Sequence, residues 1–354
     1  MTRVLIAAGG TAGHVVPALA VADELRARGT DVVWVGGERS EAELVPGAGY
    51  PLHRIDVRGL SRSDPLAAAR AAALALRAAA RAARILRAER PDAVFGGGGY
   101  VAGPVGLASV AQRIPLVLSE ADSVLGLTNR LLARFARRLC LAFPIPGRDG
   151  PRYRLTGRPV PPPATDRAGA RTALGLPEGE DLVVVFGGSL GARSINQAAV
   201  EAFADAPYRV LHAAGERDFS ALRAPRGGYE LRPYLATEEF SRALAASDLV
   251  IARAGGSIFE ICSHGRPAVL VPYPHASADH QTTNARWMAD AGAAVILPDA
   301  ELDGSRLRRE ADALLGDRAR LEAMARASAA LARPRAAAEV ADEVLAAARP
   351  ERQE

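Results

Sequence analysis

The stretch VLIAAGGTAGH at residues 4–14 and the stretch LVVVFGGSLGA at residues 182–192 decide the fold class. In each stretch a short apolar run ends in a pair of glycines, and residues with helical spacing follow. This order predicts a strand, a glycine turn and a helix. Because the two stretches lie about half a chain apart, they predict two related α/β domains.

Other short apolar runs support this reading. They occur at 32–35, 93–95, 116–118, 209–213, 249–252 and 268–271, and helical segments separate them. Strands that alternate with helices are typical of parallel sheets covered on both faces. The predicted fold class is therefore α/β, with two doubly wound, Rossmann-like parallel-sheet domains.

A proline-rich segment, TGRPVPPP at residues 156–163, marks the expected domain boundary. Such a segment is stiff and poor in hydrogen-bond donors, as an interdomain linker should be. We predict an N-terminal domain over 1–158 and a C-terminal domain over 159–334. A last helical stretch, about 335–354, has no strand after it and could pack back on the N-terminal domain.

The composition excludes several kinds of protein. All 44 basic residues are arginine, so a Walker phosphate loop, a pyridoxal Schiff base and a kinase-like catalytic lysine are excluded. The net charge is only +4 and aromatic residues make up 5%, which is little for a base-stacking surface, so we expect no nucleic-acid partner.

The cysteines and the apolar runs limit which metal sites, membrane segments and cellular compartments we expect. Cys140 and Cys262 are the only cysteines, and no Asp-x-Asp sequence occurs, so we expect no metal and no cofactor. The longest uncharged stretches are interrupted by glycine and proline, so we expect no membrane-spanning helix and favour a reducing, cytoplasmic compartment.

The segment 58–90 carries eight arginines. Asp64 and Pro65 predict a helix start, and at 100° per residue Arg70, Arg77, Arg81 and Arg84 share one face, opposite Ala68, Ala72, Ala79 and Leu86. One interpretation is a solvated face above an alanine-packed interface. The other is attachment to an anionic membrane surface, to which each basic residue contributes about 1 kcal/mol.

Three glycine-rich turns, at 9–13, 96–99 and 187–191, could bind phosphate through backbone N–H groups at helix starts. Each could instead be a tight packing turn. None has the glycine spacing of a dinucleotide site, and the run 32–35 ends in Gly36 and Gly37, not in an acidic residue. A nicotinamide-dependent enzyme is therefore disfavoured.

A polar cluster covers 253–260 and 272–284. Glu260 is placed to accept hydrogen bonds from ribose hydroxyls, or alternatively to interact with the dipole of its own helix. His280, Gln281 and Asn284 offer imidazole and amide groups that suit sugar hydroxyls.

The motifs at 9–20, 126–130, 187–193 and 279–285 resemble those of the MurG family, in glycosyltransferase family 28, and the similarity runs from about residue 3 to about residue 345. The resemblance implies a GT-B fold and an inverting, metal-independent hexosyltransferase. It implies transfer of N-acetylglucosamine from UDP-GlcNAc to lipid I, forming the β-1,4-linked disaccharide of lipid II for peptidoglycan. The implied location is peripheral, on the cytoplasmic face of the bacterial cell membrane.

The resemblance also assigns site residues. Those implied to bind the donor are Thr11, Ala12, Gly13, Asn129, Ser189, Leu235 beside the uracil, Gly255, Gly256 and Ser257 around the diphosphate, Glu260 at the ribose, His280 and Gln281. Arg158 is a further donor candidate, as a substitute for a family arginine that is missing at Pro161. We expect Gly97, Gly98 and Tyr100 to bind the acceptor.

The sequence departs from the family pattern in places. Ala12 stands where a glycine is usual, the residues at 119–122 are SEAD instead of HEQN, and the Arg-Ala-Gly motif is one residue shorter before Glu260. These departures concern the acceptor preference and the details of donor contact.

For the chemistry we predict a single in-line displacement at the anomeric carbon, with a general base that takes the proton of the acceptor hydroxyl. His14 is the first candidate, because an ordinary histidine titrates near pH 6.5, and Glu120 is the second. Backbone N–H groups and a helix end would stabilise the departing UDP. Two alternatives stay open: a GT-B enzyme with a diacylglycerol acceptor, and a non-catalytic protein that binds nucleotide sugars.

Overall fold

The computed structural model describes residues 1–57, 65–188, 191–225 and 227–349, without the side chains of 65–73 and 75. The chain forms two compact units. The first comprises Met1–Pro161 and the described residues from Arg333 on, and the second is Pro162–Ala332. The boundaries expected from the sequence, after residues 158 and 334, lie close to these. Arg158 stays with the first unit, where its guanidinium donates to the Gly13 carbonyl.

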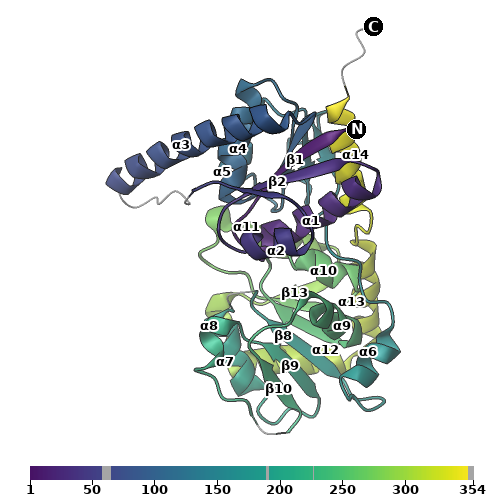
Figure 1. The fold of residues 1–354 in the computed structure, drawn as a ribbon. Helices are drawn as coiled ribbons and strands as arrows, with labels where there is room; N and C mark the ends of the chain where they lie inside the picture. Colours follow the sequence, from purple (N-terminus) through teal and green to yellow (C-terminus); the bar gives the residue numbers. More distant parts are fainter. Residues whose placement is uncertain (58–64, 189–190, 226, 350–354) are drawn as a thin grey trace. The chain divides into compact units, whose positions relative to one another are not determined.

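A seven-stranded parallel sheet forms the centre of the first unit (Figure 1). Its strand order is β3-β2-β1-β4-β5-β6-β7. The strands are β1 (Arg3–Ala8), β2 (Asp31–Gly36), β3 (Leu52–Arg54), β4 (Ala93–Gly98), β5 (Leu116–Glu120), β6 (Arg138–Leu141) and β7 (Tyr153–Leu155). Because all pairs are parallel, the turns that follow the strands lie along one edge of the sheet.

Helices cover both faces of this sheet. They are α1 (Ala12–Ala27), α2 (Glu41–Gly47), α3 (Pro65–Glu89), α4 (Gly99–Ala111), α5 (Leu127–Leu132) and α14 (Ala336–Ala348). Val4 and Ile6 of β1 pack in a core with α1 and α14, while Leu5 and Ala7 pack in a second core with α3, α4 and α5. The period of two along a strand thus gives each face its own core.

The helix α14 is tied to the first unit by both apolar and ionic contacts. Val340 and Val344 are fully buried in the core that contains α1. On its polar side, Glu343 pairs with Arg138 at 2.9 Å and with Arg154 at 3.0 Å. The chain therefore crosses to the second unit and returns to the first.

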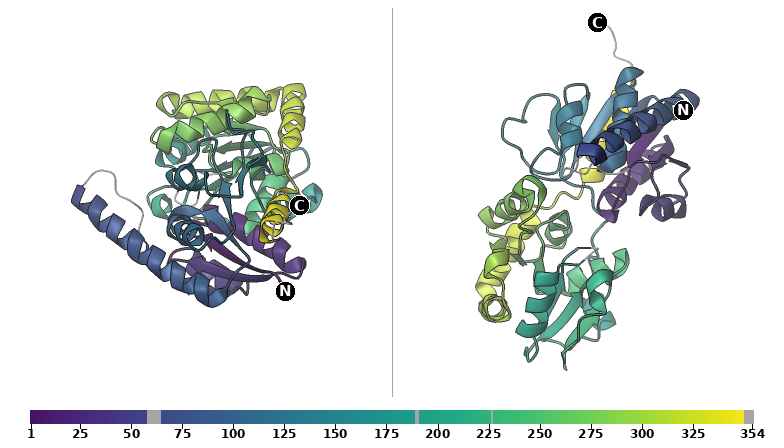
Figure 2. Two further views of the ribbon diagram at one scale, coloured as in Figure 1. Left: turned by 90° about the horizontal axis from the view of Figure 1, so that it is seen from above. Right: turned by 90° about the vertical axis from the view of Figure 1, so that its left-hand side faces the viewer.

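The arginine-rich helix α3 projects from the first unit (Figures 1 and 2). Arg77, Arg81 and Arg84 are exposed, and Ala78, Ala82 and Leu86 are the residues buried against the core. Leu86 is thus buried as predicted, whereas Ala79 is only half-buried and Ala78 and Ala82 are buried in addition. Asp64 and the side chains of Ala68, Arg70 and Ala72 lie outside the described residues.

The second unit has a six-stranded parallel sheet in the order β10-β9-β8-β11-β12-β13. The strands are β8 (Leu182–Phe186), β9 (Arg209–Ala213), β10 (Tyr229–Arg232), β11 (Leu249–Ala252), β12 (Ala268–Leu270) and β13 (Ala294–Ile296). The helices are α6 (Arg167–Ala173), α7 (Arg193–Ala202), α8 (Glu216–Phe219), α9 (Thr237–Ala246), α10 (Ile258–Ser263), α11 (His280–Asp290), α12 (Gly304–Gly316) and α13 (Arg318–Ala330), with 3-10 turns η1 (Ser277–Asp279) and η2 (Asp299–Glu301).

The predicted fold class is confirmed in both units. In the second unit α9, α10 and α11 pack on one face of the sheet, and α7, α12 and α13 pack on the other. Within the described parts of the chain, none of the helices combines the length and the apolar character that crossing a membrane requires.

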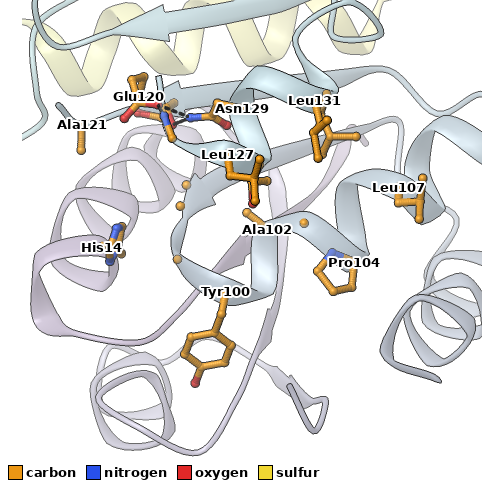
Figure 3. Close-up of a pocket in the computed structure, with 18 of the residues that line it drawn as sticks. His14, Tyr100, Ala102, Pro104, Leu107, Glu120, Ala121, Leu127, Asn129 and Leu131 are labelled. Carbon is orange, nitrogen blue, oxygen red and sulfur yellow. Dashed lines mark hydrogen bonds between the residues drawn. The ribbon is translucent and has the colours of Figure 1, made fainter. Parts of the chain in front are cut away.

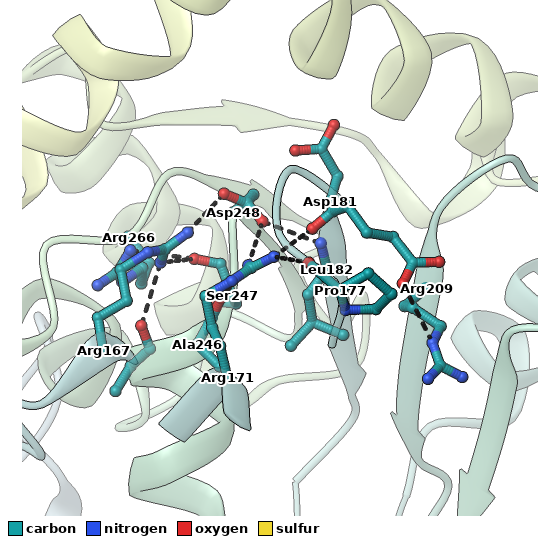
Figure 4. A network of polar contacts seen from close by, with 12 residues as sticks. Arg167, Arg171, Pro177, Asp181, Leu182, Arg209, Ala246, Ser247, Asp248 and Arg266 are labelled. Atoms are coloured by element: carbon teal, nitrogen blue, oxygen red, sulfur yellow. Dashed lines mark hydrogen bonds and ion pairs between the residues drawn. The ribbon is translucent and has the colours of Figure 1, made fainter. Parts of the chain in front are cut away.

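An arginine cluster around Asp248 joins α6 and the end of α9 to the start of β8 (Figure 4). The carboxylate of Asp248 accepts from Arg167 at 2.6 Å, Arg171 at 3.3 Å and the Leu182 backbone N–H at 2.9 Å. Arg167 also donates to carbonyls at the C-terminus of α9. Burial lowers the pKa of the nearby Arg266 to about 10. The carboxylate of Asp248 therefore offsets the positive charges of the arginines around it.

Replacing Asp248 with alanine should destabilise the second unit by about 3 kcal/mol, because it leaves clustered arginines without their anion. The measurement is the shift in the urea unfolding transition. Asp205→Ala is the matched control: Asp205 pairs with Arg308 but its side chain is 90% exposed, so the change should be below about 1 kcal/mol. Equal shifts for the two variants would contradict the structural role of Asp248.

Candidate functional site

In each unit a cavity lies at the edge where the parallel strands end. The ends of the strands, the loops after them and the adjoining helices together supply the lining residues, at the edge where ligands generally bind to open parallel sheets. The two cavities differ in character, and each is described within its own unit.

The first cavity has a volume of about 900 Å³ and lies beside α4, α5 and the end of β5 (Figure 3). Leucines, a phenylalanine and a proline form much of its wall, together with glycines and a few polar groups. It brings together six of the residues singled out in the sequence, namely His14, Gly97, Gly98, Tyr100, Glu120 and Asn129. They come from α1, the β4–α4 turn, β5 and α5, which the chain order alone does not place together.

His14 lies in the first turn of α1, with its ring against the β4–α4 turn. A Cβ atom at Gly98 would lie 2.6 Å from His14 Cδ2, and Gly98 has φ +109°, so both space and backbone conformation require glycine there. The buried Nδ1 of His14 has no hydrogen-bond partner among the described residues. Packing thus holds the ring in place, and Nδ1 makes no hydrogen bond to the described residues.

Burial lowers the pKa of His14, and the positive charge of Arg158 lowers it further. The carboxylates of Asp122 and Glu41 act in the opposite direction, but the net shift is downward from 6.5. His14 is therefore a neutral imidazole at pH 7, which is the form that can accept a proton.

Glu120 ends β5 and is buried, and both of its carboxylate oxygens accept hydrogen bonds. Oε2 accepts from Gly126 N at 2.8 Å and from Asn129 Nδ2 at 2.9 Å, and Oε1 accepts from Asp122 N at 3.2 Å. Burial raises the pKa of Glu120, although these hydrogen bonds oppose the shift. The carboxylate thus organises the loop between β5 and α5.

Tyr100 lines the cavity, but its hydroxyl donates to Glu41 Oε1 at 2.7 Å. In Figure 3 its ring points away from the side on which Glu120 and Asn129 lie. Sequence reasoning missed Glu41. One indication was present in the sequence: Glu41 comes four residues after Gly37, close enough for its carboxylate to accept a hydrogen bond from the Gly37 N–H.

The second cavity has a volume of about 850 Å³ and is rich in positive charge. Its lining residues are Gly187, Gly188, Gly191, Ala192, Arg193, Ser194, Arg217, Arg253, Tyr273, Pro274, His275, Gln281 and Asp299. Three arginines thus line the cavity together with the glycine turn that precedes α7: Arg193 begins α7, Arg217 lies in α8 and Arg253 directly follows β11. Such a set of charges and backbone N–H groups suits an anion.

Arg253 is the most constrained of these arginines, with a side chain only 10% exposed. Its Nη1 donates to Asp299 at 2.5 Å, and its Nη2 donates to Ser194 Oγ at 2.7 Å. Asp218 pairs with Arg217 at 2.8 Å and approaches Arg193 at 3.9 Å. Buried or half-buried acids therefore hold the cations in place.

Sequence reasoning did not assign roles to Arg193, Arg217, Arg253 or Asp299. The available signal was position: Arg193 begins the helix after the glycine turn, and Arg253 directly follows β11. Arg217 and Asp299 carry no such local signal, because only the fold brings them to this cavity.

Gln281 is the donor candidate that lines the second cavity. Its Oε1 accepts from Tyr273 N at 2.9 Å, which leaves the Nε2 group as a donor. Ser189, which the sequence places in the same glycine turn, lies outside the described residues.

The structure places the other donor candidates elsewhere. Those of the second unit are not among the residues that line the second cavity. Leu235 packs in the core and is 9% exposed. Gly255, Gly256 and Ser257 form the turn before α10, Glu260 lies within α10, and His280 is the first residue of α11. Thr11, Ala12, Gly13, Asn129 and Arg158 belong to the first unit. For Leu235, side-chain burial leaves only the backbone for contact with a ligand.

No group of three or more metal-ligating side chains occurs within the described ranges. The nearest carboxylates to the second cavity are already paired with arginine, as shown by Asp299 and Asp218.

Comparison with known families divides the chain as its two sheets do. Residues 4–140 match the glycosyltransferase family 28 N-terminal domain, and residues 182–340 match the glycosyltransferase family 28 C-terminal domain.

Individual proteins resemble the whole chain. A transferase from Alkalilimnicola ehrlichii, named UDP-N-acetylglucosamine–N-acetylmuramyl-(pentapeptide) pyrophosphoryl-undecaprenol N-acetylglucosamine transferase, is 44% identical, over 96% of this chain and 97% of its own. One of the same name from Moorella thermoacetica is 43% identical, over 94% and 95%.

Among solved structures, MurG from Acinetobacter baumannii has a TM-score of 0.77 at 31% identity, over 98% of this chain and all of its own. The glycosyltransferase of kitacinnamycin, at 20% identity and a TM-score of 0.74, shares the fold. The two-sheet architecture is that of GT-B glycosyltransferases, and the chain belongs to glycosyltransferase family 28 and, within it, to the MurG family that its motifs indicated.

Proposed function

We propose that this chain transfers N-acetylglucosamine from UDP-GlcNAc to lipid I, forming lipid II for peptidoglycan. The names of its relatives describe this reaction for those proteins. The observation that carries the proposal is the contrast between an arginine-rich cavity in one unit and an apolar cavity with a neutral imidazole in the other.

The arginine-rich cavity suits the nucleotide diphosphate. Its guanidinium groups and the amides at the start of α7 match the charge of two phosphates. Among the described residues no side chain caps the N-terminus of α7, which leaves its first N–H groups to a ligand. The Gln281 amide would bind a sugar hydroxyl, and Glu260 and the turn at 255–257 remain proposed donor contacts.

The apolar cavity suits a lipid-linked acceptor. Its leucines and phenylalanine would contact the isoprenoid portion, while His14 and the backbone of Gly97 and Gly98 would face the sugar. His14 removes the proton from the acceptor hydroxyl as the oxygen bonds to the anomeric carbon and the bond to UDP breaks, which inverts that carbon. We favour His14 over Glu120 because both oxygens of Glu120 already accept hydrogen bonds.

Departing UDP takes up negative charge, and the fixed arginines of the second cavity can stabilise that charge without a metal. Arg253 needs no rearrangement to do so, since Asp299 and Ser194 already hold it.

We also propose peripheral binding to an anionic membrane surface, on the cytoplasmic face of the cell membrane. Leu76, Leu131 and Phe135, at the rim of the first cavity, are 67%, 61% and 50% exposed. Arg134 lies over the Phe135 ring, and the exposed arginines of α3 add positive charge. Apolar side chains beside arginines suit an interface with acidic headgroups.

The first test of the function is transfer of radiolabelled sugar from UDP-GlcNAc to a short-chain lipid I analogue. We expect turnover that EDTA leaves unchanged, and His14→Ala should lower kcat by about 10²–10⁴-fold. Binding of UDP to this variant, measured by calorimetry, should stay near that of the wild type. Transfer to diacylglycerol alone, or binding without any transfer, would reject the proposal in favour of another acceptor or a non-catalytic role.

The pH dependence tests the state of His14. Since only neutral His14 accepts a proton, kcat/KM should rise with pH through a pKa below 6.5 and then level off. Arg158→Gln removes a positive charge that lowers the pKa of His14, so the acid limb should move to higher pH. Arg154→Gln, an arginine of the same unit that pairs with Glu343, is the control and should leave the limb in place. If the acid limb of kcat/KM stays at the same pH in Arg158→Gln, that result would argue against His14 as the base.

Membrane binding is tested by cosedimentation with vesicles of phosphatidylglycerol or of phosphatidylcholine. The wild type should bind the anionic vesicles, and less so as salt rises, because screening weakens the attraction. Leu131→Ser with Phe135→Ser should reduce binding severalfold, whereas Leu155→Ser, which is 46% exposed and outside the cavity rim, should not. Equal binding to both vesicle types would rule out an anionic partner.

A further inference from the structure

We propose that Glu41 is a positioning residue: its buried carboxylate holds the first glycine turn and Tyr100 in the wall of the acceptor cavity. The effect on catalysis rests on the function proposed above, but the contacts do not.

The carboxylate of Glu41 joins the ends of three neighbouring strands. Oε2 accepts from Gly10 N at 2.8 Å, and Oε1 accepts from Gly37 N at 2.8 Å and from Tyr100 Oη at 2.7 Å. Gly10 follows β1, Gly37 follows β2, and Tyr100 follows β4, which are adjacent in the order β2-β1-β4. One side chain, fully buried, thus fixes three loops.

The glycines around Glu41 make room for it. A Cβ atom would lie 2.7 Å from Glu41 Oε1 at Gly9, 2.8 Å from Glu41 Cγ at Gly36, and 2.5 Å from Tyr100 Oη at Gly37. Side chains at these positions would displace the carboxylate or the phenol. This explains Gly36 and Gly37 at the end of β2, where a dinucleotide-binding fold has an acidic residue.

Glu41 is an anion at neutral pH. Burial alone would raise its pKa, but the hydrogen bonds from Gly10, Tyr100 and Gly37 outweigh burial and hold the pKa below its usual range. Burial and the neighbouring carboxylate raise the pKa of Tyr100, so the phenol remains a donor. The three hydrogen bonds are therefore charge-assisted and stronger than neutral ones.

These contacts extend to the cavity through the packing of two glycine turns. Gly99 has φ +76°, and a Cβ atom there would lie 1.8 Å from the Gly9 carbonyl oxygen, so the second turn rests directly on the first. Gly97 to Tyr100 and His14 all line the cavity. A shift of the first turn would therefore move both the cavity wall and the proposed base.

The test compares Glu41→Ala and Glu41→Gln with Glu43→Ala, an exposed acid on the same helix. Glu41→Ala should lower kcat/KM for the lipid I analogue about tenfold or more, because misplacement of the turn by ~1 Å is costly. Formate is the probe for the vacated carboxylate position. It should raise the Tm of Glu41→Ala and restore part of the rate, with neither effect on the wild type or on Glu43→Ala.

The pH profile supplies a readout that a purely structural role would not move. Glu41→Gln removes a negative charge, and of the charges that act on His14, Glu41 and Asp122 raise its pKa while Arg158 lowers it. The acid limb should therefore move to lower pH in Glu41→Gln, opposite to its movement in Arg158→Gln.

Unchanged acceptor kinetics in Glu41→Ala, or a Tm that formate does not raise, would overturn the proposal. If Glu41→Ala does not fold, Glu41→Gln and Tyr100→Phe decide the matter by their acceptor kinetics. A wild type without transfer would reject the proposed function alone, since the formate effect on Tm would still test the placement of Glu41.

Discussion

Backbone amides at the carboxyl edge of a parallel sheet need acceptors, and the rest of this structure depends on how that need is met. The turns after the strands carry N–H groups that no neighbouring strand can pair, and leaving them buried without a partner is costly. In the first unit the chain supplies its own anions. Glu41 serves the ends of β1, β2 and β4, and Glu120 serves the loop after β5. These donors are therefore satisfied within the protein itself.

The second unit begins with the same order of strand, glycine turn and helix. At the corresponding edge, however, it carries arginines, where the first unit carries the carboxylates of Glu41 and Glu120. Arginines at 193, 217 and 253 line the cavity beside the glycine turn, and Asp218 and Asp299 pair with Arg217 and Arg253. A cavity lined by arginines and a glycine turn suits a phosphate group, whereas a cavity walled mainly by apolar side chains suits the apolar part of a ligand. This difference, more than the shared topology, explains why two similar sheets can serve two unlike substrates.

The sequence sufficed for the central strands of both sheets, because buried parallel strands are continuous apolar runs. It did not suffice for β3, β6, β7, β10 and β13, because these strands at or near the sheet edges are only three or four residues long and offer no extended apolar run. Among site residues, His14 and Gly98 were predictable since they belong to local motifs. Glu41 was not identified, because two of its three donors, Gly10 and Tyr100, are distant in the chain. Asp299 was missed because Arg253 is distant from it, and the burial of Leu235 reflects packing that no motif encodes.

His14, which we propose as the general base, must be neutral and yet accept a proton readily. Burial and Arg158 keep His14 neutral, but either effect alone, carried too far, would make the imidazole too weak a base. The carboxylates of Asp122 and Glu41 limit the shift. Glu41 limits the shift because hydrogen bonds hold its pKa low and keep it ionised although it is buried. The pKa of Glu120, in contrast, is raised by burial, so its carboxylate is ionised less readily. The buried carboxylate that fixes the geometry of the turn thus also tunes the residue that the turn presents.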